Sequence, residues 1–370
     1  MKDKGFVSSQ GEYNKKHRQM ASPTFTLSSY QSEFMQSTAA KTKQLLDVWR
    51  VQPGGGVVEI DAANQMQRLA LDIIGDVAFT YDFGGIAAIE LELAGGRAAE
   101  NDQLLELINV SMEEIGRMAV PFITKPMLET ASRWGVPNVR RMEAAMEGMR
   151  VMCQPMIEDR RRRMLAGEAC PRDLLGSLLQ AQMDQVAAGG EGFTDFELWE
   201  DVHDVMGAGH ETSANVMTCA LWEVAMHPEV DAQVCEELQE LGGSLPTFED
   251  FKEGRLATTE AVIKETLRLY PPLPIFPRLC GEDNTLPTGH IVPEGDCVMM
   301  SAYAMGRLAS LWPEPYAFRP SRFTDPAETE GRHPFAWVPF GAGPRMCLGS
   351  NFAMSSTAVM LATILQEYKM

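Results

Sequence analysis

Apolar residues recur three and four positions apart over most of the first two thirds of the chain, which is the spacing that gives an α-helix one apolar face. The clearest such stretches are 34–50, 63–81 and 139–164. Short joints rich in glycine and proline separate the helical stretches. Because no internal repeat or long linker interrupts the pattern, the sequence predicts one domain over residues 1–370 that is mainly α-helical.

The longest predicted helix begins after Thr194 and ends before Pro228. Thr194 and Glu197 have the spacing of a capping box, and proline stops a helix. Two glycines in the middle of this helix, Gly207 and Gly209, each cost about 1 kcal/mol relative to alanine. Either another group approaches the backbone closely at this point, or a second helix crosses there.

The helical pattern of apolar residues ends after Tyr270. Proline-rich irregular segments follow, with a strand candidate around residues 297–303, and a helical pattern returns only after Cys347. We therefore expect a minor β-sheet region in a mainly α fold.

The net charge of −19 argues against nucleic acid or an anionic membrane surface as a general partner, because both would be repelled. Two basic islands, 14–18 and 159–164, are local exceptions. Either island is a candidate docking patch, although a solvated helix face is favoured for the second. This chain contains no hydrophobic run that predicts a targeting or transmembrane segment.

The seven cysteines form no C-x-x-C pair and are odd in number, so the sequence predicts neither a disulfide framework nor a zinc site. A reducing compartment fits this usage. Six of the seven are expected to be small buried hydrophobic residues.

Cys347 is the exception, because it lies in the glycine-rich stretch 340–349 directly before a predicted helix. The N-terminus of a helix stabilises a thiolate, and Arg345 adds a cation nearby. A structural cysteine, a nucleophile and a metal ligand are the three interpretations. A nucleophile needs a base, and no pattern ties His290 or His333 to Cys347. A single axial thiolate to haem iron needs no second protein ligand.

The stretch 340–349 resembles the F-x-x-G-x-R-x-C-x-G haem loop of the cytochrome P450 superfamily, eukaryotic type. Three further segments are similar to motifs of that family and occur in the family order. They are its oxygen-activation motif (208–213), its E-x-x-R motif (265–268) and its P-x-R-F segment (318–323). The resemblance covers nearly the whole chain and implies the cytochrome P450 fold, in which Arg322 joins Glu265 and Arg268.

By this resemblance Cys347 is the ligand of the iron in heme b. Candidate partners for the haem carboxylates are Arg18, Arg278 and Arg345, with His17 as a weaker candidate. Phe340, Gly343 and Gly349 complete the haem loop.

The resemblance also implies roles for the middle of the long helix. Ala208 and Gly209 would leave room for O2, and Glu211 and Thr212 would pass protons to it. The alternative for Thr212 is a hydroxyl bonded back to a helix carbonyl.

The implied activity is a monooxygenase that inserts one oxygen atom from O2 into a C–H bond of a small apolar substrate. A long-chain lipid or fatty acid is favoured. A carotenoid, terpenoid or sterol hydroxylase, a haem-thiolate isomerase or dehydratase, and an inactive haem-binding fragment are the alternatives. Electrons would come from NADPH through a flavoprotein reductase or a ferredoxin, which would dock at residues 14–18.

The chain departs from the family pattern in two ways. Asn14 stands where the family usually has a tryptophan. The membrane anchor, early strands and pocket-covering loop at the front, and the last strand hairpin at the back, are missing. We therefore expect an incomplete domain that binds haem weakly, and a longer form anchored in the endoplasmic reticulum or plastid membrane.

Overall fold

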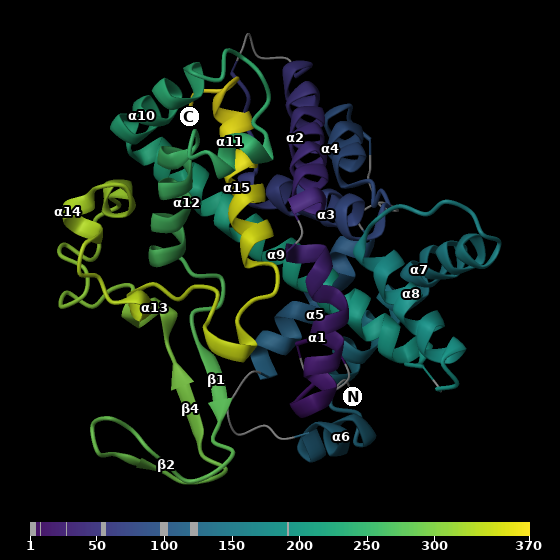
Figure 1. Cartoon of the computed structure of the whole chain (residues 1–370). Helices are drawn as coiled ribbons and strands as arrows, with labels where there is room; N and C mark the ends of the chain where they lie inside the picture. The colour runs from purple at the N-terminus through teal and green to yellow at the C-terminus, as the bar shows by residue number, and fades with distance from the viewer. Residues whose placement is uncertain are drawn as a thin grey trace.

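The computed structural model describes residues 5–7, 9–26, 28–52, 57–96, 103–118, 125–190 and 192–370. Helices dominate the fold (Figure 1). The helices before the central one are α1 (Gly11–Thr26), α2 (Ser28–Arg50), α3 (Ala62–Phe79), α4 (Gly85–Leu93), α5 (Gln103–Met118), α6 (Lys125–Arg133), α7 (Pro137–Leu165) and α8 (Leu174–Ala187). The later ones are α9 (Asp195–Met226), α10 (Pro228–Gln239), α11 (Phe248–Lys252), α12 (Ala257–Leu269), α13 (Ala302–Met305), α14 (Pro326–Thr329) and α15 (Ser350–Leu365).

The three helices with the clearest predicted periodicity are confirmed as α2, α3 and α7. Local signals explain the ends of α3. Its N-cap Asp61 accepts a hydrogen bond from the backbone N–H of Asn64, and Thr80 adopts a left-handed conformation with φ 47° that ends the helix. Pro137 opens α7, where its missing N–H costs nothing.

Helix α9 has the predicted capping box. The Glu197 N–H donates to the Thr194 hydroxyl at 3.2 Å, and the Thr194 N–H donates to the Glu197 carboxylate at 2.7 Å. The helix runs through the middle of the molecule, with α3 and α15 packed on it (Figure 1). The middle of α9 is therefore held between neighbouring helices.

The predicted sheet region is small. Strand β1 (Phe276–Leu279) pairs antiparallel with β4 (Cys297–Met300), and β2 (Asn284–Thr285) pairs with β3 (Ile291–Val292). The expectation that helix returns only after Cys347 is wrong, because α13 and α14 lie between. These two helices have four residues each, which is too short for a periodic apolar pattern to reveal them.

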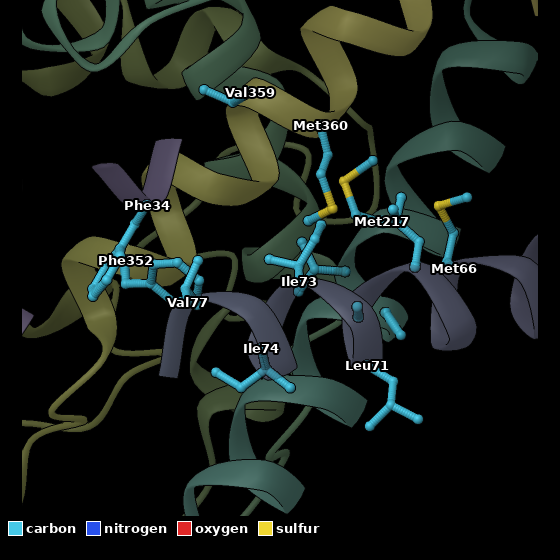
Figure 2. Packing of buried hydrophobic residues seen from close by; sticks show 14 of the residues in the cluster. Phe34, Met66, Leu71, Ile73, Ile74, Val77, Met217, Phe352, Val359 and Met360 are labelled. Atoms are coloured by element: carbon cyan, nitrogen blue, oxygen red, sulfur yellow. The ribbon is translucent and has the colours of Figure 1, made fainter. Parts of the chain in front are cut away.

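The core lies where α3 packs on α2 and α9, and α15 packs on the same two helices. In Figure 2, Val77 of α3 lies toward Phe34 of α2 and Phe352 of α15, while Ile73 lies toward Met360 of α15 and Met217 of α9. The packing of α3 on α9 also explains one of the two glycines of α9. A Cβ atom at Gly209 would lie 2.7 Å from Cδ1 of Ile74 on α3.

A Cβ atom at Gly207 would lie 2.6 Å from Cε of Met112 on α5. Cε is the flexible end of the Met112 side chain and can move aside, so the approach of a neighbouring helix explains Gly209 and not Gly207.

The expected buried cluster of Glu265, Arg268 and Arg322 is present. Arg268 donates to both Glu265 oxygens at 2.7 Å, and Nε of Arg322 donates to Glu265 Oε1 at 3.2 Å. Arg268 also donates to the carbonyls of Gly306 and Pro315. The cluster therefore joins the irregular segment after β4 to α12.

The cysteine prediction is only partly confirmed. All seven are free, as expected. Of the six predicted to be buried, however, only Cys153 is; Cys170, Cys219, Cys235 and Cys280 are half-buried and Cys297 is exposed. Cys297 lies on a two-stranded sheet that leaves side chains open to solvent.

The basic island 159–164 was expected to be a solvated helix face. Three of its four arginines agree with this prediction. Arg161, Arg162 and Arg163 pair with nearby carboxylates. Arg160 contradicts the prediction, because it is buried, pairs with Asp173 at 2.8 Å and donates to the carbonyl of Phe79. The turn of α7 that carries it faces the end of α3 and not solvent.

Within the described ranges, no helix is both long enough and apolar enough to cross a membrane.

Candidate active site

A cavity of about 350 Å³ lies between α1, α9 and the loop before α15. Nine of the eleven residues that the sequence proposed for the site line it, and Glu211 and Gly343 do not. The nine are Arg18, Ala208, Gly209, Thr212, Arg278, Phe340, Arg345, Cys347 and Gly349. The structure therefore brings together residues from four distant parts of the chain.

The loop that carries Cys347 is closed by its own backbone. The Cys347 N–H donates to the carbonyl of Phe340 at 2.9 Å. Gly341 and Gly343 have φ of 70° and 72°, which other residues rarely adopt, and these two glycines make the turns. Gly349, in contrast, has a φ of −90° as the N-cap of α15 and makes no such turn.

Cys347 is exposed and lines the cavity. Burial raises the pKa of its thiol, while the Gly349 N–H and the charge of Arg18 act in the opposite direction. Burial is the largest of these effects. In this site the helix N-terminus therefore does not outweigh burial.

Three arginines border the cavity without an acidic partner. Arg18 donates to the carbonyl of Met346 at 2.7 Å, Arg278 to that of Pro277 at 2.9 Å, and Arg345 to those of Ser9 and Val7.

Within the described ranges, no carboxylate forms an ion pair with any of the three arginines. Burial, followed by repulsion from Arg18 and Arg278, lowers the pKa of Arg345. A ligand with carboxylates at its edge, as haem has, would relieve this repulsion, and guanidinium groups suit such a ligand. The residues present therefore fit haem.

His17 lies outside the cavity, so its assignment as a carboxylate partner is wrong. Its Nδ1 is 2.6 Å from Oδ2 of Asp201, and both side chains are buried. One residue along a helix rotates the side chain by about 100°, so Arg18 faces the cavity while His17 faces α9. Burial raises the pKa of Asp201 to about 6, and His17 opposes that shift.

Asn14, which stands where the family has a tryptophan, is buried and does not line the cavity. Its amide donates to the carbonyl of Phe6 at 2.7 Å. The side chain therefore holds the segment before α1 in place.

Thr212 lines the cavity, and its hydroxyl donates to the carbonyl of Ala208 at 2.6 Å. The bond back to the helix, which was the alternative to a catalytic role, is thus present together with access to the cavity. Glu211 is half-buried beside Thr212, and burial raises its pKa. In the described part of the chain, no three of His, Cys, Asp and Glu gather as a metal site.

A sequence model of the family described as Cytochrome P450 matches residues 1–370. The chain belongs to the cytochrome P450 family. Its fold, mainly helical with two small antiparallel sheets, agrees with that membership.

Two mammalian relatives are similar over nearly the whole chain. "Cytochrome P450 4F6" of Rattus norvegicus is 27% identical over 98% of this chain and 66% of the relative. "Ultra-long-chain fatty acid omega-hydroxylase" of Homo sapiens is 28% identical over 99% of this chain and 67% of the relative.

A plant relative is similar to the same extent. "Cytochrome P450 97B2, chloroplastic" of Glycine max is 28% identical over 99% of this chain and 67% of the relative. The chain therefore spans about two thirds of the length of the curated relatives it matches.

Sequence reasoning missed several residues of this P450 cavity. Asp204 lines it from α9, and Phe6 and Val7 line it from the segment before α1. The sequence could have indicated Asp204 as a cavity residue. It precedes Ala208 by four residues and Thr212 by eight, which places all three on one helix face. No local signal marks Phe6 and Val7.

Proposed function

We propose that this chain forms the haem-binding part of a monooxygenase that inserts one oxygen atom from O2 into a C–H bond of an apolar long-chain lipid. The observation that carries the proposal is the shared cavity of Cys347 and Thr212, bordered by three arginines that pair with no carboxylate of the described residues. Membership of the cytochrome P450 family and relatives named as hydroxylases support the same class of oxidoreductase.

The residues assigned to the cofactor are those around the cysteine loop. Cys347 would bind the iron of heme b through its sulfur, and Arg18, Arg278 and Arg345 would bind the carboxylates. Phe340 and Gly349 line the same cavity, and Gly343 shapes the loop from outside it. When bound, the haem supplies the activation of O2.

In this proposal the residues of α9 leave room for O2 and deliver protons to it. Ala208 and Gly209 have small side chains where α9 borders the cavity, which leaves room for O2. The Thr212 hydroxyl is already oriented by the Ala208 carbonyl, so we assign to its Oγ1 the delivery of protons. Glu211 keeps its proton to a higher pH than a free glutamate, and we assign it the supply of protons to Thr212.

The substrate is assigned from the lining of the cavity. Val205, Val216, Leu273 and Phe276 make much of the wall apolar, which suits an alkyl chain. A relative named as a fatty acid omega-hydroxylase supports a long-chain lipid. A carotenoid, terpenoid or sterol hydroxylase would use the same residues, and so would an inactive haem-binding fragment.

Electrons are assigned to NADPH, delivered through a flavoprotein reductase or a ferredoxin. The exposed cations Lys15 and Lys16 lie on α1, one turn from the cavity-lining Arg18, and suit an acidic partner. The whole protein is assigned to the endoplasmic reticulum or plastid membrane, with a membrane anchor. The printed name of the soybean relative, "chloroplastic", supports the plastid.

The test is the absorption spectrum of the reduced carbon monoxide complex, followed by product analysis with a reductase and a panel of lipids. We expect a haem-thiolate spectrum that Cys347→Ser abolishes while helical circular dichroism is kept, because a hydroxyl is a poor ligand for ferric iron. An unchanged spectrum in Cys347→Ser would rule out the ligand assignment. A normal spectrum without any product would favour the inactive fragment.

A further inference from the structure

One carboxylate lines a cavity whose other charged residues are all arginines. Asp204 is the only Asp or Glu among the described residues that border it. Its side chain is 11% exposed. A carboxylate with so little exposure is costly unless it binds something, because its charge is poorly solvated.

The contacts of Asp204 use only part of its capacity to accept hydrogen bonds. Its Oδ2 accepts the N–H of Val7 at 2.9 Å. Its Oδ1 lies 3.8 Å from Nδ1 of His203, which is too far for a hydrogen bond. An ionised carboxylate has about four acceptor positions, so Oδ1 can still accept from a ligand.

The arginines do not neutralise Asp204 directly. Arg345 donates to the carbonyl of Val7 at 2.9 Å, while Asp204 accepts from the N–H of the same residue. The Val7 residue thus stands between the two charges. The negative charge of Asp204 is therefore available on its side of the cavity.

The position of Asp204 on α9 sets a distance. Asp204, Ala208 and Thr212 are four residues apart and share one helix face. At 1.5 Å per residue, Asp204 lies about 12 Å along the axis from Thr212. A group held by Asp204 would thus lie about 12 Å from a substrate carbon next to Thr212.

We propose that Asp204 selects the substrate by accepting a hydrogen bond from a hydroxyl or ammonium group at the far end of an alkyl chain. A free carboxylate at that end is disfavoured, because two carboxylates in a poorly solvated site repel one another. The substrate class is then a long-chain lipid with a donor head group, such as a fatty alcohol or a long-chain amine. This inference rests on the proposed function and narrows its substrate.

The experiment compares dodecanol, dodecylamine and dodecanoic acid, which share one alkyl chain. Affinity is measured by calorimetry on the purified full chain loaded with haem, so that the haem carboxylates, and not dodecanoic acid, occupy Arg18, Arg278 and Arg345. We expect the alcohol and the amine to bind about tenfold or more tightly than the acid, since a site built around a polar group discriminates strongly. Tighter binding of the acid to the unmodified protein would overturn the inference without any variant.

Two substitutions separate charge from shape. Asp204→Asn keeps an oxygen that accepts from Val7 but removes the charge. We expect it to weaken the amine and to strengthen the acid by about tenfold each, with little change for the alcohol. Asp204→Leu should weaken both donors. Unchanged affinity ratios in Asp204→Asn would overturn the inference.

Asp195→Asn is the matched control. It removes one negative charge from the same helix, at an exposed position that pairs with Arg161 outside the cavity. The affinity ratios should stay as in the unmodified protein. A change as large as that in Asp204→Asn would show that overall charge, and not Asp204, sets the preference.

A last variant tests whether Asp204 serves only to hold the segment before α1 through Val7. Val7→Pro removes the N–H that Asp204 accepts, and the inference expects the preference for donors to remain. Loss of the preference for the alcohol and the amine in Val7→Pro would overturn the inference. The carbon monoxide spectrum of the same samples reports on the proposed function, so the two failures are distinguishable.

Discussion

Arg268 donates to both carboxylate oxygens of Glu265, at 2.7 Å each, from three residues further along α12, and neither side chain is exposed. Glu265 also accepts from Nε of Arg322 and from the N–H of Arg319. One carboxylate thus compensates two buried cations. The segment that leads to Cys347 is attached to α12 through this cluster.

Glu265→Ala should prevent stable folding. It leaves Arg268 and Arg322 buried without a carboxylate, a loss on the order of 3–5 kcal/mol in the free energy of unfolding. Chemical denaturation followed by circular dichroism, together with haem content, measures the effect. A variant that binds haem normally and loses less than about 1 kcal/mol would contradict this prediction.

Glu260→Ala provides the control for that experiment on the same helix. Glu260 pairs with Lys264 at 2.6 Å four residues on, and both side chains are partly exposed. Pairs of this kind contribute only about 0.3–0.5 kcal/mol. Glu260→Ala should therefore fold and bind haem like the unmodified protein.

Thr212→Ala should uncouple electron use from product formation. It removes the hydroxyl that the Ala208 carbonyl orients in the cavity, while the shape of the wall changes little. Since positioned proton transfer contributes about 10²–10⁴-fold, we expect product per NADPH to fall at least tenfold and peroxide to rise. Substrate affinity should stay within about twofold, because a neutral hydroxyl on the wall is lost and no charge changes.

A matched threonine on the same helix tests whether loss of any such hydroxyl has this effect. Thr218 donates to the carbonyl of Ala214 at 2.9 Å in the same way, and it lies outside the cavity. Thr218→Ala should couple normally. Equal uncoupling in both variants would remove Thr212 from the mechanism.

Gly209→Ala should destabilise the protein because of one contact. The new methyl group would meet Ile74 at 2.7 Å, and such overpacking costs about 1–3 kcal/mol, which exceeds the gain of about 1 kcal/mol in helix propensity. In an Ile74→Ala background the clash is gone, so the same substitution should be neutral or stabilising. A double-mutant cycle of unfolding free energies measures this coupling. Additive effects would show that Ile74 is not the reason for the glycine.

Asp201 should make the protein less stable as the pH rises from about 4 to about 6. Burial raises its pKa to about 6, whereas an unfolded aspartate has a pKa of about 3.9. In this window the unfolded chain has lost a proton that the folded chain keeps. The free energy of unfolding therefore falls with pH, by an amount on the order of 2–3 kcal/mol.

Asp201→Asn has no proton to lose, so its unfolding free energy should change less over that pH range. Denaturation at several pH values between about 4 and 7 compares the two proteins. Parallel pH profiles would mean that Asp201 has an ordinary pKa despite its burial.

Local features of the site were predictable from the sequence alone. The capping box of Thr194 and the turns at Gly341 and Gly343 depend on neighbouring residues, and the structure contains them. The position of the cysteine loop before α15 follows from the same local pattern. The contiguous motif around Cys347 carried the resemblance to the family, which the comparison with the family model confirms.

The tertiary structure decided which face of each helix meets the cavity. The sequence could not tell that Arg18 faces the cavity while His17 meets Asp201, or that Asp204 reaches the cavity while Glu211 does not. It also left open why α9 carries Gly209, until Ile74 was found against it. The reason is physical: periodicity encodes that a helix has an apolar face, but the rotation and crossing of each helix depend on packing against segments distant in the chain.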